Sequence, residues 1–260
     1  MGKWWLYRGF VLSSVKRDFQ ARYRNSLLGP VWPLLQPLAM IVIYTLVFSQ
    51  VMQARLPGLH DGLAYGIYIC CGILTWGLFA EVTNRCLSMF LDNANLLKKL
   101  SFPRLCLPLI VLLGALLNFA ITLGIFLLVL VIIGRFPGES VLALPLLIGL
   151  QLIFALGIGM TLGVLNVFFR DIGQLFAIAL QLWFWLTPIV YPANILPASL
   201  QPWLALNPMT GLMQSYQGIF LHNAWPDWQA LLPIVVTGLL SCAVAACIFR
   251  SKEADMLDEI

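Results

Sequence analysis

The sequence has few charged side chains. Fifteen Lys and Arg and eleven Asp and Glu occur among 260 residues, so 10% of the chain is charged while 61% is hydrophobic. An ordinary soluble domain carries about 25% charged residues, and so few charges cannot coat a soluble protein of this size. The net charge of +4 is also too small an excess to indicate nucleic-acid binding. The composition therefore predicts a protein that is solvated mostly by lipid.

The chain also lacks the patterns of metal sites and of common catalytic centres. It has two histidines, and its six cysteines form no CxxC pair, so no metal site is predicted. No GxxxxGK[ST] motif occurs, which argues against ATP hydrolysis by this chain. No nucleophile–base pair or carboxylate pair has a useful spacing. We therefore expect no enzymatic activity and no cofactor in this chain.

Six long windows contain no Asp, Glu, Lys or Arg: 25–54, 62–80, 105–134, 140–169, 172–226 and 228–249. A membrane helix needs about 20 mostly apolar residues, and lipid favours helices because each backbone polar group must be paired within its own segment. The sequence therefore predicts a single all-α membrane domain over 1–260. Its six transmembrane helices are expected at 31–53, 63–84, 107–133, 143–169, 172–191 and 229–249.

The basic residues are distributed unequally between the predicted loops. One side has thirteen: Lys3, Arg8, Lys16, Arg17, Arg22, Arg24, Arg85, Lys98, Lys99, Arg104, Arg170, Arg250 and Lys252. The other side has only Arg55 and Arg135. The positive-inside rule therefore places both termini in the cytoplasm. Five prolines interrupt 192–228, which favours short re-entrant helices there over a seventh span that would reverse the C-terminus.

Residues 8–28 are predicted to form an amphipathic helix ahead of the first span. On a helical wheel one side carries Val11, Leu12, Val15, Phe19 and Tyr23, and the other carries Arg17, Gln20 and Arg24. Such a helix lies in the membrane surface, with its bases toward anionic headgroups or toward a partner. The alternative is an anchor that only sets orientation.

The predicted cytoplasmic segment 85–106 carries apolar residues beside bases. Leu96, Leu97, Leu100 and Phe102 lie outside any span, next to Lys98 and Lys99. This pattern favours a short helix that docks on another protein, and the alternative is that it packs on its own bundle.

Two features inside the predicted spans also have a structural interpretation. Glu81 is followed by Arg85 at i+4, so we interpret it as a paired carboxylate at a helix end rather than as an ion-coupling site. Gly159 and Gly163 form a GxxxG pattern, which is typical of close helix packing.

Aromatic residues are frequent in spans one, two and five. Trp and Tyr gather at membrane interfaces, so many of these side chains need no further role. The functional alternative is a path lined with aromatic faces, which attract the C–H faces of sugars and bind weakly enough for a chain to slide. The candidates for such a substrate channel are Tyr44, Phe48, Trp76, Trp183 and Trp185.

Two stretches resemble a known family. They are RYRNSLLGPVWPLLQP at 22–37, and WLTPIVYP at 185–192 continuing into LNPMT at 206–210. Both are similar to ABC-2 type permeases, and more closely to the transmembrane subunit of the ABC exporters of O-antigen, capsule and teichoic acid. The order of segments agrees over nearly the whole chain.

The resemblance implies a homodimer joined to two copies of a separate ABC ATPase subunit, which binds ATP and Mg²⁺. Residues 8–28 are then the interface helix, 85–106 the coupling segment and 192–228 the periplasmic gate region. The implied coupling residues are Leu96, Leu97, Lys98, Lys99, Phe102 and Arg104. The implied gate residues are Tyr191, Pro192, Asn207 and Pro208.

The implied substrate is a polysaccharide on a polyprenyl-pyrophosphate lipid, exported across the cytoplasmic (inner) membrane. Arg22 and Arg24 are then candidates to meet the pyrophosphate at the cytoplasmic entrance, because guanidinium groups form bidentate phosphate contacts. Two alternatives stay open. Within the same fold the substrate is a small lipid or drug, and in a different class the chain is an ion-coupled carrier or a membrane enzyme.

Overall fold

The structure is a computed structural model, and it describes residues 3–23, 35, 38–40, 42–43, 62–99, 106–193, 197, 199, 201–253 and 255–259. Within these residues every regular element is a helix, which confirms the predicted all-α class. Several predictions fall outside the described part: most of span 31–53, the residues Arg24, Tyr44, Phe48, Phe102 and Arg104, and the side chains of Arg22 and Lys99.

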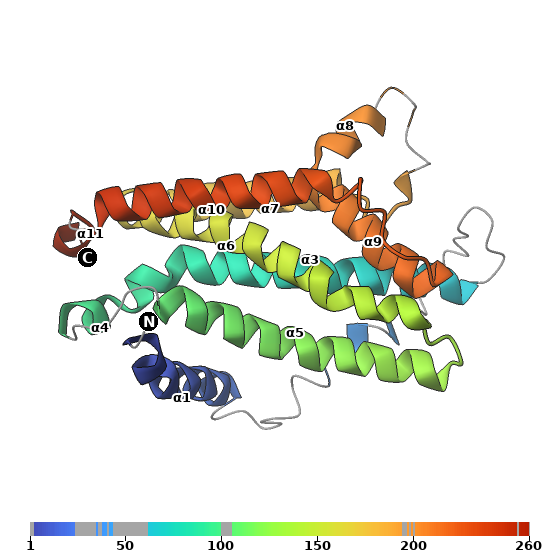
Figure 1. Cartoon of the computed structure of the whole chain (residues 1–260), viewed down its shortest axis with the longest axis horizontal. Helices are drawn as coiled ribbons and strands as arrows, with labels where there is room; N and C mark the ends of the chain where they lie inside the picture. The colour runs from blue at the N-terminus through green and yellow to red at the C-terminus, as the bar shows by residue number, and fades with distance from the viewer. Residues whose placement is uncertain are drawn as a thin grey trace.

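Four of the described helices are long and apolar enough to cross a membrane. They are α3 (Gly62–Asp92), α5 (Cys106–Ile132), α6 (Leu144–Phe168) and α10 (Leu232–Lys252). Each coincides with a predicted span to within a few residues at most ends, although α3 continues eight residues beyond its predicted end at residue 84. Figure 1 shows all four running along the long axis of the molecule.

The fifth predicted span, 172–191, is a shorter helix in the structure. Helix α7 covers Ile172–Leu186, which is 15 residues, or about 22 Å. The chain leaves the helix at Thr187, whose backbone is extended, because a residue that precedes proline is driven out of the helical region. The six-span count therefore stays a prediction.

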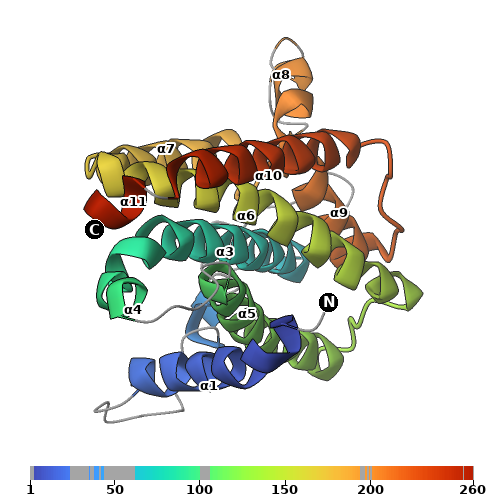
Figure 2. The same cartoon turned by 60° about the vertical axis from the view of Figure 1, so that its left-hand side comes forward.

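Helix α3 lies at the centre of the bundle. Its most apolar window is 72% buried, against 22% for the corresponding windows of α5 and α10. Helices α5, α6, α7 and α9 (Pro208–His222) all contact it. Figure 2 shows the helices in the order α1 (Lys3–Tyr23), α5, α3, α6 and α10. The outer helices thus keep one face for lipid while α3 is enclosed by protein.

Glycines allow α6 to approach its two neighbours closely. A methyl group at Gly159 would come within 2.6 Å of Cβ of Cys86 on α3, and one at Gly163 would meet the Cys86 carbonyl oxygen. On the other side of α6, a methyl group at Gly157 would come within 2.6 Å of the Cys242 backbone nitrogen on α10. The close helix packing predicted from the GxxxG pattern is therefore confirmed.

Further helices gather at the two ends of the bundle. The segments α1, α4 (Ala94–Lys99) and α11 (Asp255–Glu259) lie toward one end of the long axis in Figure 1, and α8 (Gln201–Leu206) and α9 lie toward the other. A 3₁₀ helix at Glu139–Ala143 precedes α6. Two short helices thus occupy the proline-rich region between α7 and α10, where re-entrant helices are predicted.

We expect Gly163→Ala to destabilise the protein by about 1–3 kcal/mol, because the added methyl group meets backbone rather than a flexible side chain. The midpoint of thermal unfolding in detergent measures the effect. The matched control is Gly149→Ala in the same helix, where no atom lies within 4 Å of the added carbon and the better helix propensity of Ala makes the change neutral or stabilising. Equal loss of stability in both variants would contradict close packing at Gly163.

Candidate functional site

Helix α1 is held against α5 by apolar side chains. Val11 and Val15 form a buried cluster with Cys106 and Ile110 at the start of α5. Leu12, which the helical wheel places on the same side, is 63% exposed, because successive residues of a helix point about 100° apart. The face of α1 that contacts α5 is therefore narrower than the apolar side predicted from the sequence.

A polar network connects α1, α3 and α5. Arg85 Nη2 lies 3.3 Å from Asp18 Oδ2 on α1, and Arg85 Nη1 lies 3.5 Å from Glu81 Oε1, one turn earlier on α3. Asn118 Nδ2 on α5 donates to Glu81 Oε2 at 2.8 Å. The predicted Glu81–Arg85 pair is thus confirmed, and it belongs to a larger network. Its predicted place at a helix end is wrong, because α3 continues to Asp92.

The sequence reasoning missed two members of this network. Asp18 is the only acidic residue among the first 60. A single carboxylate in an otherwise basic segment is a signal that it pairs with a specific base. Asn118 lies in the middle of an apolar helix and gave no charge signal. Which helices these two side chains connect depends on how the helices pack.

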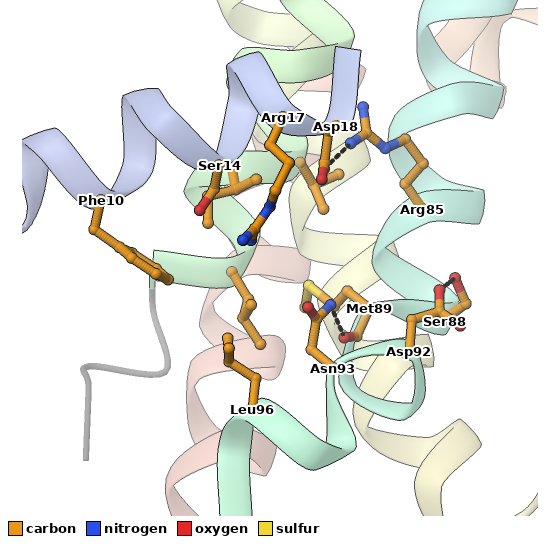
Figure 3. Close-up of a pocket in the computed structure, with 13 residues that line it drawn as sticks. Phe10, Ser14, Arg17, Asp18, Arg85, Ser88, Met89, Asp92, Asn93 and Leu96 are labelled. Carbon is orange, nitrogen blue, oxygen red and sulfur yellow. Dashed lines mark hydrogen bonds and ion pairs between the residues drawn. The ribbon is translucent and has the colours of Figure 1, made fainter. Parts of the chain in front are cut away.

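A pocket of about 300 Å³ lies between α1, the end of α3, α4 and the start of α5. Figure 3 shows Arg17 pointing from α1 into this pocket, while Arg85 reaches Asp18 at its edge. The rest of the lining is mixed: polar side chains such as Ser14, Ser88 and Asp92 lie beside apolar ones such as Met89 and Leu96. The side of α1 next to the pocket is therefore not filled by close packing against α3 and α4.

Helix α4 exposes polar side chains and packs against the bundle through one leucine. Leu97 is only 8% exposed and packs in the main core. For this residue the structure therefore shows the alternative interpretation, in which the segment packs on its own bundle. Leu96 lines the pocket. Asn95 and Lys98 are exposed. The accessible part of α4 is therefore its polar face, and the coupling role of these residues stays a prediction.

At the opposite end, side chains from α3 and α9 hold the segment 187–191, which we call the strap. The Tyr65 hydroxyl donates to the Val190 carbonyl oxygen at 2.7 Å. The Tyr68 hydroxyl lies 3.0 Å from the Pro188 carbonyl oxygen and 2.8 Å from that of Tyr191. Gln217 Nε2 on α9 also donates to the Pro188 oxygen, at 3.1 Å. These bonds satisfy strap carbonyls that no helix pairs.

Asn207, one of the predicted gate residues, joins the end of α7 to the start of α9. Its Oδ1 accepts from Trp183 Nε1 at 2.9 Å and from the Met209 backbone at 3.1 Å, which caps α9. Its Nδ2 donates to Thr187 Oγ1 at 3.0 Å. Pro208 occupies the first turn of α9, where proline is favoured.

The other predicted gate residues lie at the end of the strap. Tyr191 donates its hydroxyl proton to the Trp185 carbonyl oxygen at 2.7 Å, and Pro192 follows as a buried residue. Tyr191, Pro192, Asn207 and Pro208 thus lie along the strap and the turn into α9. Their role as a gate stays a prediction.

The described aromatic candidates divide into a buried and an exposed set. Trp76 is 8% exposed and packs edge-on against Trp183 and Phe184, with ring centroids 6.4 Å and 5.7 Å away. Trp183 is half-buried, and Trp185 is 56% exposed. Within one copy of the chain, Trp76 therefore serves the core, whereas Trp185 presents its ring to the surroundings. The channel assignment of all three stays a prediction.

Comparison with known proteins gives the class of the molecule. Residues 10–221 match the family model of the ABC-2 type transporters, and the chain belongs to this family. It is therefore a multi-pass membrane protein of a transporter family, as the four long apolar helices require.

Individual relatives align over almost the whole chain. The chain is 33% identical over 256 residues to the O-antigen export system permease protein RfbA of Myxococcus xanthus, covering 98% of this chain and 96% of that protein. It is 29% identical over 235 residues to the protein of that name from Klebsiella pneumoniae, with 90% and 88% covered. It is 21% identical over 246 residues to the polysialic acid transport protein KpsM of Escherichia coli, with 93% and 92% covered.

We expect Asn207→Ala to lower the free energy of unfolding by about 1–2 kcal/mol, since it removes the cap of α9 and leaves the Trp183 indole N–H without its acceptor. Asn207→Asp keeps the acceptor and is expected to lose less. Thermal unfolding in detergent measures both variants. The control is Asn84→Ala, which removes one bond on the exposed side of α3, and the prediction is contradicted if it matches Asn207→Ala.

Proposed function

We propose that this chain is the channel-forming permease subunit of an ATP-driven exporter that moves a lipid-linked polysaccharide of the O-antigen type across the cytoplasmic (inner) membrane. The observation that carries the proposal is the similarity to the Myxococcus xanthus O-antigen export permease, which runs over 98% of the chain. Two further relatives, aligned over 88% and 92% of their lengths, are named as an O-antigen export permease and a polysialic acid transport protein.

The chain needs a partner that hydrolyses ATP. No P-loop motif occurs in these 260 residues. In the proposed complex, ATP and Mg²⁺ bind to an ABC ATPase subunit, and two copies of each subunit are present. The exposed bases Arg8, Arg17 and Lys98 lie on α1 and α4, at the end of the bundle that also carries α11. We assign this end to the cytoplasm and to the ATPase, with α4 as the coupling helix.

The polysaccharide passes between two copies of the chain. Helix α7 suits the wall of such a path because Phe176 is its only buried residue among Ile172–Leu186, and its exposed Trp185 offers an aromatic face to sugar rings. The sequence makes Tyr44 and Phe48 further candidates for contacts with the sugar rings. Arg22 and Arg24 meet the pyrophosphate of the polyprenyl carrier, and the strap with α8 and α9 forms the periplasmic gate.

Deletion of the gene tests the substrate class. We expect the surface polysaccharide to disappear and polyprenyl-linked polymer to accumulate inside the cell, because synthesis continues while export stops. Fractionation of the cell's glycans followed by lipid extraction of the intracellular fraction measures both quantities. Restoration by the intact gene is the control. Normal surface glycan in the deletion strain would contradict the proposal and direct attention to a small lipid or drug.

Acidic substitutions on α4 test the ATPase partner. The double variant Asn95→Glu and Lys98→Glu changes exposed residues without touching the buried Leu97. We expect the amount of ATPase that co-purifies with the permease to fall about tenfold or more, since misplaced interface charges cost several times the thermal energy. The control is Lys252→Glu, an exposed base at the same end of the molecule. An equal loss with this control, or no loss with the double variant, contradicts docking through α4.

A further inference from the structure

The network of Asp18, Arg85, Glu81 and Asn118 connects three helices at one place. Asp18 belongs to the peripheral helix α1, Glu81 and Arg85 to the central helix α3, and Asn118 to α5. All the contacts of this network are made by side chains. Its position therefore makes it a mechanical connection between the surface helix and the membrane-spanning helices.

We propose that Asp18, Arg85, Glu81 and Asn118 are positioning residues that make α3 and α5 follow the movement of α1 during transport. We call this network the joint. The proposal rests on the proposed function, because the ATPase partner supplies the movement that the joint transmits.

The pocket beside α1 is the first argument for the joint. Because about 300 Å³ of open space separates part of α1 from the end of α3 and from α4, close packing does not hold these elements together there. Figure 3 shows the Asp18–Arg85 pair at the edge of this space. A displacement of α1 toward or away from α3 is therefore resisted by this ion pair in addition to the apolar contacts of α1 with α5.

The placement of the Arg85 guanidinium is the second argument. It lies against the backbone of α5 at Gly114, where an added methyl group would come within 2.7 Å of Nη1 and 3.1 Å of Nη2. A glycine at this position leaves the space that the guanidinium occupies. The position of Arg85 thus depends on α5 as well as on its two carboxylate partners.

The unequal exposure of the two carboxylates is the third argument. The Glu81 side chain is 18% exposed and also accepts a hydrogen bond from Asn118, whereas the Asp18 side chain is 46% exposed. Arg85 donates a hydrogen bond to Asp18, whereas its 3.5 Å contact with Glu81 is an ion pair without a hydrogen bond. Water screens an ion pair less where both charges are largely buried. Glu81 therefore keeps the guanidinium in the bundle, and Asp18 is the contact that tightens or opens when α1 moves.

Three variants distinguish the proposed positioning role of the joint from a general effect on the stability of the protein. Asp18→Asn removes the charge and keeps the shape, and Asp18→Glu restores the charge. Gly114→Ala displaces the guanidinium without changing any charge, and it does so at low cost because Arg85 ends in a flexible side chain. The control Asp255→Asn removes an exposed carboxylate that pairs with Lys252 outside the network.

Hydrogen exchange of the α1 amides, in the full-length permease in lipid nanodiscs, tests the joint independently of any substrate. We expect exchange to rise about two- to fivefold in Asp18→Asn and in Gly114→Ala, because each weakens one ion pair that restrains α1. Asp18→Glu and Asp255→Asn are expected to match the unchanged protein. Unchanged exchange in both Asp18→Asn and Gly114→Ala would overturn the joint, whatever the protein transports.

The polymer exported per ATP hydrolysed by the whole permease–ATPase complex tests the transmission of movement. We expect this ratio to fall about fivefold or more in Asp18→Asn and in Gly114→Ala while ATP hydrolysis continues, and to recover in Asp18→Glu. If the amount of complex, the ATP hydrolysis and the export all fall in parallel, the four residues have a purely structural role. That result would overturn the proposal. If the unchanged complex hydrolyses ATP and exports no polymer, the proposed function fails and the exchange measurement alone decides on the joint.

Discussion

The close approach of α6 to α3 is the constraint on which the rest of the structure depends. Gly159 and Gly163 place α6 against the backbone of α3 around Cys86, and Gly157 does the same for α10. In lipid, where apolar surfaces gain little by leaving the solvent, helices associate through such close contacts and through polar bonds between them. Helix α3 is consequently enclosed by its neighbours and becomes the element from which the others are positioned.

Helix α3 also carries the polar groups that bind the segments at each end of the bundle. Tyr65 and Tyr68 bind the strap at one end, and Glu81 and Arg85 bind α1 and α5 at the other. The twenty residues from Tyr65 to Arg85 span about 30 Å of helix, which equals the thickness of the hydrocarbon layer. A single buried helix thus connects the region assigned to the ATPase with the region assigned to the gate.

The sequence predicted the elements well where one local signal decided them. Uncharged windows located α3, α5, α6 and α10, and the GxxxG spacing and the i,i+4 charges identified Gly159 and Glu81. The sequence-based predictions were less accurate where contacts with several neighbouring elements determine the position of a residue. The Leu97 side chain is buried although its flanking bases suggested exposure, and Pro188 ends α7 before the predicted boundary because the residue ahead of it leaves the helix.

The sequence by itself determined the membrane class, the helical fold and the family, because hydrophobicity, charge and helix spacing act over short stretches of chain. Only the tertiary structure decided that Arg85 is shared between Asp18 and Glu81 against Gly114, and that Asn207 joins Trp183 to the start of α9. Asp18 lies 67 positions from Arg85, and Trp183 lies 24 positions from Asn207. Their partners are set by how the helices pack, which no local pattern encodes.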